Sequence, residues 1–221
     1  MAISKLNFNS LNVTPSANLA IGFDSGADDL ETSSGGGAIK FIKKLTASSS
    51  STLSFVDGSA SVVLDSTYKK YMFIFNNIHP ASADANLQVN FSIDAGSNYN
   101  VTKTTSFFRT QHGESGSGGE LGYEASLDLA QATAVKKISQ TSGADNDQGI
   151  SGILHLFNPS STTFVKHFIS QTNVSYAYSE PYAYSSYTAG YANTTSAVDA
   201  VQFSINSGNM DTGTITLYGI T

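Results

Sequence analysis

The sequence predicts an all-β protein, an antiparallel β-sandwich of jelly-roll type that follows an N-terminal arm. Three observations predict this fold. Eight to ten short apolar segments are separated by turn residues, no stretch has the period of a long helix, and no repeat of 20–50 residues runs along the chain. A trimeric β-fibre or β-helix is the competing architecture, and the lack of a short repeat disfavours it.

Composition limits the partners that the protein can have. Charged residues make up 13% of the 221 residues, with 11 Lys and Arg against 17 Asp and Glu, so we expect no basic face for nucleic acid. Cysteine is absent, which excludes disulfides and thiolate metal sites. The strongest apolar run, 71–75, is too short to span a bilayer, and the N-terminus lacks the apolar segment of a secretory signal. We therefore expect no membrane contact and synthesis in the cytoplasm.

Residues 1–38 are expected to form an arm or short strands, and residues 39–221 to form the sandwich. A Ser/Gly-rich joint at 33–37 separates the two parts. The arm carries Phe8, Leu11 and Phe23 among its apolar residues, which makes it too apolar to remain in water. It can pack on its own domain or on a neighbouring molecule, and the sequence leaves both open.

The strands of the main domain are expected in this order: 39–45, 52–56, 61–64, 71–75, 87–93 and 99–109. Segment 71–75 is apolar on both faces, which predicts a central strand, whereas 87–93 alternates as a half-buried strand does. Residues 111–120 should form a surface loop, and 127–135 a turn or two of helix. The segments 198–205 and 214–220 flank turn-forming residues and predict a closing hairpin.

A further hairpin is predicted between residues 148 and 170, where two apolar runs flank Asn158 and Pro159. Side chains alternate along a strand, so Ile153, His155 and Phe157 share one face and the leucines between them take the other. Both faces are therefore largely apolar, whereas a sheet with one wet face should alternate. We expect another subunit to cover the second face.

The expected register of this hairpin places Phe157 opposite Val165, His155 opposite His167, and Ile153 opposite Ile169. These six residues, with those of the arm, are the predicted interface. The two histidines could form a pH-sensitive or metal-linked contact, or a structural pair. Two histidines without further ligands do not make a zinc site, so no metal is expected.

Six of the eleven tyrosines lie within residues 176–191, which we interpret as a loop. Tyrosine combines a large rigid ring with a hydroxyl group, so such a loop suits recognition of a protein or a sugar. The alternative is that the rings cover the sandwich or a seam between subunits. The recognition candidates are Tyr176, Tyr178, Tyr182, Tyr184 and Tyr187.

Acidic residues offer weak alternatives for chemistry. The clusters Asp24, Asp28, Asp29, Glu31 and Asp145, Asp147 could attract calcium, but neither follows the EF-hand pattern. Glu114, Glu120 and Glu124 could supply the two carboxylates of a glycosidase, but their Gly/Ser-rich surroundings offer no apolar wall to raise a pKa. Nucleophile elbows, P-loops and dinucleotide fingerprints are absent from the sequence. We expect neither an enzyme nor a cofactor.

Three stretches, 45–80, 152–169 and 191–220, resemble β-rich proteins encoded by marine tailed bacteriophages of the pelagiphage and cyanophage type. The resemblance covers most of residues 39–221 and includes no catalytic motif. It implies a structural protein of the virion whose partners are other virion proteins, such as the major capsid or tail proteins.

Two functional hypotheses follow. The first is a capsid decoration or cement protein that forms a homo-oligomer, a trimer, and docks on the shell through its N-terminal arm. The second is a tail-associated fibre or receptor-binding module that recognises a host surface glycan through the tyrosine loop. A polysaccharide-degrading enzyme is a third, weaker hypothesis.

Overall fold

The computed structural model describes residues 20–23, 30–33, 38–177 and 181–221. The chain divides into two compact units, Met1–Ala38 and Ile39–Thr221. In the first unit, β1 (Ala20–Phe23) pairs antiparallel with β2 (Leu30–Ser33). The interface candidates Phe8 and Leu11 lie outside the described residues, as does the side chain of Phe23 at the end of β1.

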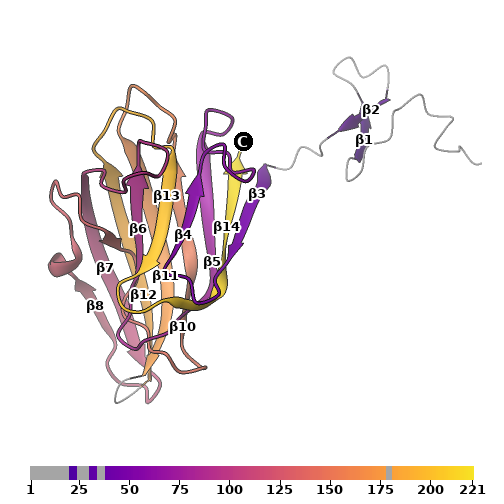
Figure 1. Ribbon diagram of the computed structural model, residues 1–221. Helices are drawn as coiled ribbons and strands as arrows, with labels where there is room; N and C mark the ends of the chain where they lie inside the picture. The colour runs from indigo at the N-terminus through magenta and orange to yellow at the C-terminus, as the bar shows by residue number, and fades with distance from the viewer. Residues whose placement is uncertain (1–19, 24–29, 34–37, 178–180) are drawn as a thin grey trace, which may run out of the picture. The chain divides into compact units, whose positions relative to one another are not determined.

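The second unit consists of two antiparallel sheets that pack face to face (Figure 1). The large sheet has the order β3-β14-β5-β10-β11-β12-β7-β8, and the small sheet has the order β4-β13-β6-β9. The strands are β3 (Ile39–Thr46), β4 (Thr52–Val56), β5 (Lys70–Pro80), β6 (Leu87–Ser92), β7 (Lys103–Gly113), β8 (Glu120–Tyr123), β9 (Lys136–Lys137), β10 (Gly149–Phe157), β11 (Lys166–Ala177), β12 (Pro181–Ala192), β13 (Ala200–Ile205) and β14 (Met210–Ile220). The predicted all-β sandwich is confirmed.

The strand connections follow a jelly roll. Strands β3, β4, β5 and β6 alternate between the two sheets, as do β9, β10, β13 and β14. The resulting layers, β3-β14-β5-β10 facing β4-β13-β6-β9, have the two-Greek-key order of that fold. Two insertions, β7-β8 and β11-β12, then extend the large sheet beyond β10. The large sheet is therefore twice as wide as the small one.

Aromatic side chains fill the space between the sheets. Phe203 of β13 lies at the centre, with its ring centroid 5.2 Å from that of Phe73 and 5.1 Å from that of Phe75, both on β5. Its ring also meets the edge of Phe55 from β4. These rings come from three strands that are distant in sequence and are fully or almost fully buried, so their packing joins the two sheets.

The extension of the large sheet lies beyond the small sheet, and the segment around β9 covers its inner face. The Thr172 hydroxyl donates to the Ile138 carbonyl over 2.8 Å, and the Gln140 amide donates to the Ser186 hydroxyl over 3.1 Å. Thr172 and Ser186 are buried polar residues of β11 and β12. Their hydrogen bonds satisfy groups that would otherwise be costly to bury.

Three lysines, Lys103, Lys136 and Lys166, are fully buried. The ammonium group of Lys103 donates to the Asn90 side-chain oxygen over 2.6 Å and to the Val101 carbonyl over 2.7 Å. Burial lowers the pKa of Lys103 and of Lys136 to about 8 in each case. Lys136 also lies over the Phe107 ring at 5.0 Å, and Lys166 donates to two backbone carbonyls. These cations tie irregular segments to strand ends.

Several predicted elements agree with the structure. Segment 71–75 lies within β5, which has neighbours on both sides in the large sheet. The hairpin at 148–170 forms as β10 and β11, although its second strand begins only at Lys166. In β6 the inward residues alternate as expected, but Asn90 and Ser92 on the other face are also buried, so that strand is not half-wet.

Other predictions were wrong. Residues 61–64 form no strand, because Ala60 and Ser61 adopt positive φ and turn the chain there. The expected helix at 127–135 is only a short 3-10 turn, Ala125–Leu127, and the described residues contain no α-helix. The segments 198–205 and 214–220 do not form a hairpin, because β13 belongs to the small sheet and β14 to the large one.

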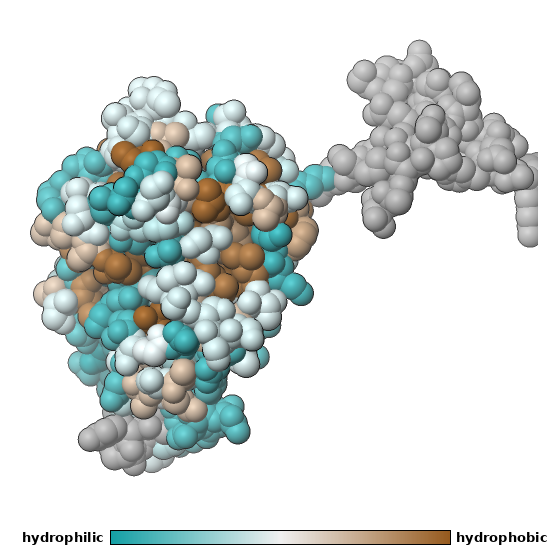
Figure 2. All heavy atoms as spheres, viewed as in Figure 1, coloured by the Kyte–Doolittle hydropathy of each residue, from teal (hydrophilic) through white to brown (hydrophobic). Residues whose placement is uncertain are grey.

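The two broad faces of the sandwich are the outer faces of its sheets. Figure 2 shows the small-sheet side, on which apolar residues are interspersed with polar ones.

Replacing Phe203 by Ala should lower the free energy of unfolding by about 3–5 kcal/mol, because the substitution leaves a cavity between the sheets. Chemical denaturation with urea measures the change. Phe164→Ala is the matched control, because that ring is 68% exposed, and its cost should stay within about 0.5 kcal/mol. Equal losses in the two variants would contradict this account of the core.

Candidate interaction surface

The outer face of the large sheet is the face turned away from the small sheet. Along β10, Leu154 and Leu156 point inward and are fully buried, whereas Ile153, His155 and Phe157 between them remain half-buried. Side chains of paired residues share a face in an antiparallel sheet, so the pairing places the partners of these three residues on the outer face too. Five of the six predicted hairpin residues thus lie on one surface.

Large apolar side chains gather on this outer face. Ile169 of β11 is 47% exposed, Phe108 of β7 is 43% exposed, and Phe41 of β3 is 64% exposed. Phe41 pairs with Tyr218 and their rings meet edge to face, while Phe108 stacks on Tyr187 with centroids 4.8 Å apart. Exposed apolar surface that is gathered on one face, rather than scattered, indicates a contact site.

A groove of about 380 Å³ runs over the middle of this face. Its walls come from four adjacent strands, β7, β12, β11 and β10, and include Phe108, Tyr187, Ile169 and Ile153. Most of the exposed wall of the groove is aromatic or aliphatic carbon. A groove with such walls offers a shape into which an apolar side chain of a partner could insert.

The same four strands carry no formal charge on their outer face. Their outward residues are Gly149, Ser151, Ile153, His155, Phe157, His167, Ile169, Gln171, Asn173, Ser175, Pro181, Ala183, Ser185, Tyr187, Ala189, Tyr191, Thr104, Ser106, Phe108, Thr110 and His112. No Lys, Arg, Asp or Glu occurs among them. Solvent-facing surfaces normally mix in charges of both signs, and depletion of charge is a property of interface centres.

His155 lies in the groove with its Nδ1 atom buried and without a hydrogen-bond partner among the described residues. Burial, together with the nearby charge of Lys70, lowers the pKa of His155 below its usual range. The ring is therefore held neutral next to Phe157, whose own ring lies 5.6 Å from the Lys70 ammonium group.

The register of the hairpin differs from the expected one by two residues. His155 pairs with Ile169 and Ile153 pairs with Gln171, so His167 is a diagonal neighbour of His155 on the same face rather than its direct partner. A shift of two residues keeps every side chain on its predicted face. Val165 pairs with no residue of β10, because the connector extends to it and β11 begins at Lys166.

The tyrosine-rich segment is a strand and not a loop. It forms most of β12, which pairs with β11 along its whole length and with β7, and Tyr176 belongs to β11. Tyr182 and Tyr184 share the inner face with Tyr176, with ring centroids 5.8 and 6.4 Å apart, whereas Tyr187 faces outward. Tyr178 lies outside the described residues.

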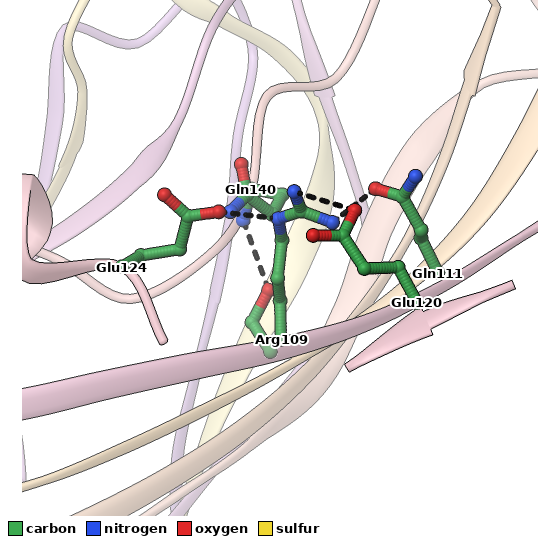
Figure 3. A network of polar contacts seen from close by, with 6 residues as sticks. Arg109, Gln111, Glu120, Glu124 and Gln140 are labelled. Atoms are coloured by element: carbon green, nitrogen blue, oxygen red, sulfur yellow. Dashed lines mark hydrogen bonds and ion pairs between the residues drawn. The ribbon is translucent and has the colours of Figure 1, made fainter. Parts of the chain in front are cut away.

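The glutamates considered for catalysis belong to a network around Arg109 (Figure 3). The Arg109 guanidinium donates to Glu124 over 2.5 Å and to Glu120 over 3.3 Å, and it also donates to Gln111. Arg109 lies 5.7 Å from the centre of the Tyr184 ring. This arrangement attaches β8 and the start of the 3-10 turn to β7. Glu114 takes no part and lies in the exposed loop between β7 and β8.

The acidic clusters do not converge on a metal site in the described part of the chain. No group of three or more His, Cys, Asp or Glu side chains there could hold a metal ion. Asp24, Asp28, Asp29 and the side chain of Glu31 lie outside the described residues. Asp147 lines a polar recess, and the Asp145 carbonyl accepts a hydrogen bond from His79 over 3.1 Å if Nε2 is protonated.

Comparisons of the sequence with protein-family models, with curated proteins and with solved structures give no match. Among the described residues, no helix has the length and hydrophobicity that crossing a bilayer requires.

Sequence reasoning missed Phe41 and Phe108 as members of the surface. Both lie in expected strands, but no local signal tells which face a residue of an isolated strand takes. The stacked partner of Phe108, Tyr187, was singled out only as part of a supposed loop. If β12 had been recognised as a strand between β11 and β7, Phe108 and Tyr187 would have been expected to lie side by side on one face.

Lowering the pH should destabilise the protein partly through His155. The pKa is about 6.5 in the unfolded chain and lower in the folded one, so the unfolded chain binds the extra proton first. Stability from this group is present above pH 6.5 and is lost as the pH falls through the folded-state pKa. The loss in melting temperature between pH 7.5 and pH 5 should be smaller in His155→Gln than in the unmodified protein. His112→Gln, a change at an exposed histidine, should retain the full loss, and identical losses in all three proteins would contradict the assignment.

Proposed function

We propose that this chain is a non-enzymatic structural protein of a bacteriophage virion, a capsid decoration or cement protein that oligomerises and docks on other virion proteins. The similarity of residues 45–80, 152–169 and 191–220 to virion proteins of marine tailed phages supports the setting. The protein is made in the host cytoplasm and functions in the particle.

The observation that carries the proposal is the outer face of the large sheet, which lacks charge across strands β10, β11, β12 and β7. The small sheet and the segment around β9 cover the inner face, whereas the outer face exposes Ile169, Phe108 and Phe41. Burying apolar surface of this kind lowers the free energy by about 25 cal/mol for each Å² removed from water. A partner that covers this face gains that free energy.

A second copy of the chain is the partner that the charges favour. Each chain has a formal net charge of −6, so like copies repel one another over most of their surfaces. The outward residues of β10, β11, β12 and β7 lack charge, so two copies can meet through these strands without charge repulsion. Three such faces turned toward a threefold axis would form a closed homotrimer with no exposed apolar face.

The N-terminal unit supplies a separate contact for docking. Residues 1–38 form a unit distinct from the sandwich and contain several large apolar residues, including Phe8 and Leu11. A sandwich that trimerises through its sheet leaves this unit as the part that binds the shell.

The arrangement of the glutamates supports a non-enzymatic role. A glycosidase needs one carboxyl group whose pKa is raised so that it can donate a proton. Here Glu120 and Glu124 both form ion pairs with Arg109, so neither carboxylate stands apart as such a proton donor.

The second candidate, a tail-associated receptor-binding module that uses the tyrosines, has less support. Tyr176 and Tyr184 pack against the core, and the Tyr176 hydroxyl donates to Asp84 over 2.6 Å. Rings that are engaged within the domain offer less surface to a glycan than a tyrosine loop would.

Replacing Ile169 by Asp should convert the trimer to a monomer, because assembly would bury an unpaired carboxylate at the centre of the interface. We expect association to weaken roughly a hundredfold or more. Light scattering during size-exclusion chromatography measures the mass, with the unmodified protein at three times the 23.2 kDa of one chain.

Ile93→Asp is the matched control for this experiment. Ile93 is 42% exposed, close to the value for Ile169, but it follows β6 of the small sheet. This variant should remain a trimer. If the unmodified protein is a monomer, or if both variants keep its mass, the assembly proposal is wrong.

Deleting residues 1–37 should abolish binding to phage particles while the remaining chain still folds and forms trimers. The physical reason is that Ile39–Thr221 forms a compact unit with a core of its own. Co-sedimentation with particles that lack the protein measures binding, and circular dichroism checks the fold. Normal particle binding by the truncated protein would show that docking does not depend on this unit.

A further inference from the structure

A polar recess of about 590 Å³ opens on the outer face of the large sheet, next to the apolar groove but chemically unlike it. Strands β5, β10, β11 and β14 contribute to it, together with the connector that precedes β10. The side chains that matter most are Asn77, Asp147, Asn173 and Asp211. A cavity of this volume is within the usual range for small-molecule sites.

Irregularities in three adjacent strands shape this end of the sheet. The pairing of β14 with β5 shifts register between Met210 and Thr214, and the pairing of β5 with β10 shifts between Ile150 and Gly152. Gly213 has φ of +111°, and a Cβ there would lie 2.4 Å from the Asn77 carbonyl oxygen. Such bulges bend strands and re-aim side chains, and they are common beside binding sites.

Two carboxylates in the recess are uncommitted. Neither Asp147 nor Asp211 has a hydrogen-bond or ion-pair partner for its carboxylate within the described residues. Other polar groups are held in place. The Asn77 backbone N–H donates to the Ser151 hydroxyl over 3.0 Å, and the Ser175 hydroxyl donates to the Asp147 backbone carbonyl over 3.0 Å. The recess therefore has an ordered wall and free acceptors.

The chemistry of the lining selects the class of ligand. Among the described residues, no Lys or Arg lines the recess, and the charges of Asp147 and Asp211 disfavour a phosphate, a sulfate or another anion. No aliphatic or aromatic residue larger than threonine lines it apart from His79, so an apolar ligand would gain little. A ligand rich in hydroxyl donors satisfies carboxylate and amide oxygens together, and charge-assisted hydrogen bonds of this kind are the strong ones.

We propose that this recess binds a saccharide, with Asp147 and Asp211 accepting hydrogen bonds from sugar hydroxyl groups and Asn77 and Asn173 completing the contacts. This binding is separate from the proposed assembly, because the recess shares only β10 and β11 with the apolar groove and lies beyond it along those two strands. A decorated particle would then present sugar-binding sites.

The test uses the full chain and a panel of neutral monosaccharides and disaccharides containing glucose, galactose and mannose. Saturation-transfer NMR in the presence of EDTA detects binding and removes any contribution from calcium. The unmodified protein should bind at least one member of the panel. Asp147→Ala combined with Asp211→Ala should weaken that binding roughly tenfold or more, because both charged acceptors are lost.

Two further variants make the outcome decisive. Thr212→Trp fills the recess from its exposed rim and should also weaken binding, while Glu114→Ala, which removes a carboxylate from another exposed loop, should bind as the unmodified protein does. Absence of binding to the whole panel overturns the proposal, as does binding by the double variant and by Thr212→Trp that equals binding by the unmodified protein. Binding that requires calcium overturns it too. Ile169→Asp should still bind sugar, which separates failure of this site from failure of the assembly.

Discussion

The rest of the structure depends on one constraint: each of the two faces of a β-sheet must either be polar enough for water or be buried against other parts of the protein or a partner. In this domain the large sheet is twice as wide as the small one. The small sheet covers the jelly-roll half of its inner face, and the segment around β9 covers the extension. Within the described residues, the outer face exposes Phe41, Phe108 and Ile169, and across four strands it carries no formal charge. Packing inside the sandwich therefore stabilises the fold, while the outer face remains available for a partner.

The extension of the jelly roll creates that surface. Without β7, β8, β11 and β12 the two sheets would match in width, and the groove between Ile153 and Phe108 would not exist. The extension needs cover on its inner face, which explains the buried polar residues Thr172 and Ser186 and the buried Lys136. Three buried lysines without carboxylate partners are costly in isolation, and their bonds to carbonyl groups offset part of that cost.

How much the sequence could predict depended on how local each signal was. The apolar run 71–75 and the alternation at 87–93 are local, and both gave the right strands. The faces of the hairpin were also predictable, since Ile153 and Leu154 alternate whatever the register. The register of the hairpin was not predictable, because it depends on where the connector ends, and Lys166 is held there by a carbonyl group from a distant segment.

Strand β12 was missed because its tyrosines, serines and alanines carry no aliphatic pattern. The pairing of β13 and β14 was misjudged because a jelly roll separates neighbours in sequence into opposite sheets. The polar recess depends on register shifts in three strands, and no local sequence pattern predicts such shifts.

The central claim is that neighbouring molecules cover the outer face of the large sheet in the assembled protein. Hydroxyl-radical footprinting of the full chain tests it most directly, because two phenylalanines provide an internal comparison. Phe41, on the outer face, is 64% exposed in the isolated chain, and Phe164, in the connector before β11, is 68% exposed. We predict that in the assembled protein Phe41 and Phe108 are protected from oxidation while Phe164 is oxidised freely. Equal oxidation of Phe41 and Phe164 would contradict the account.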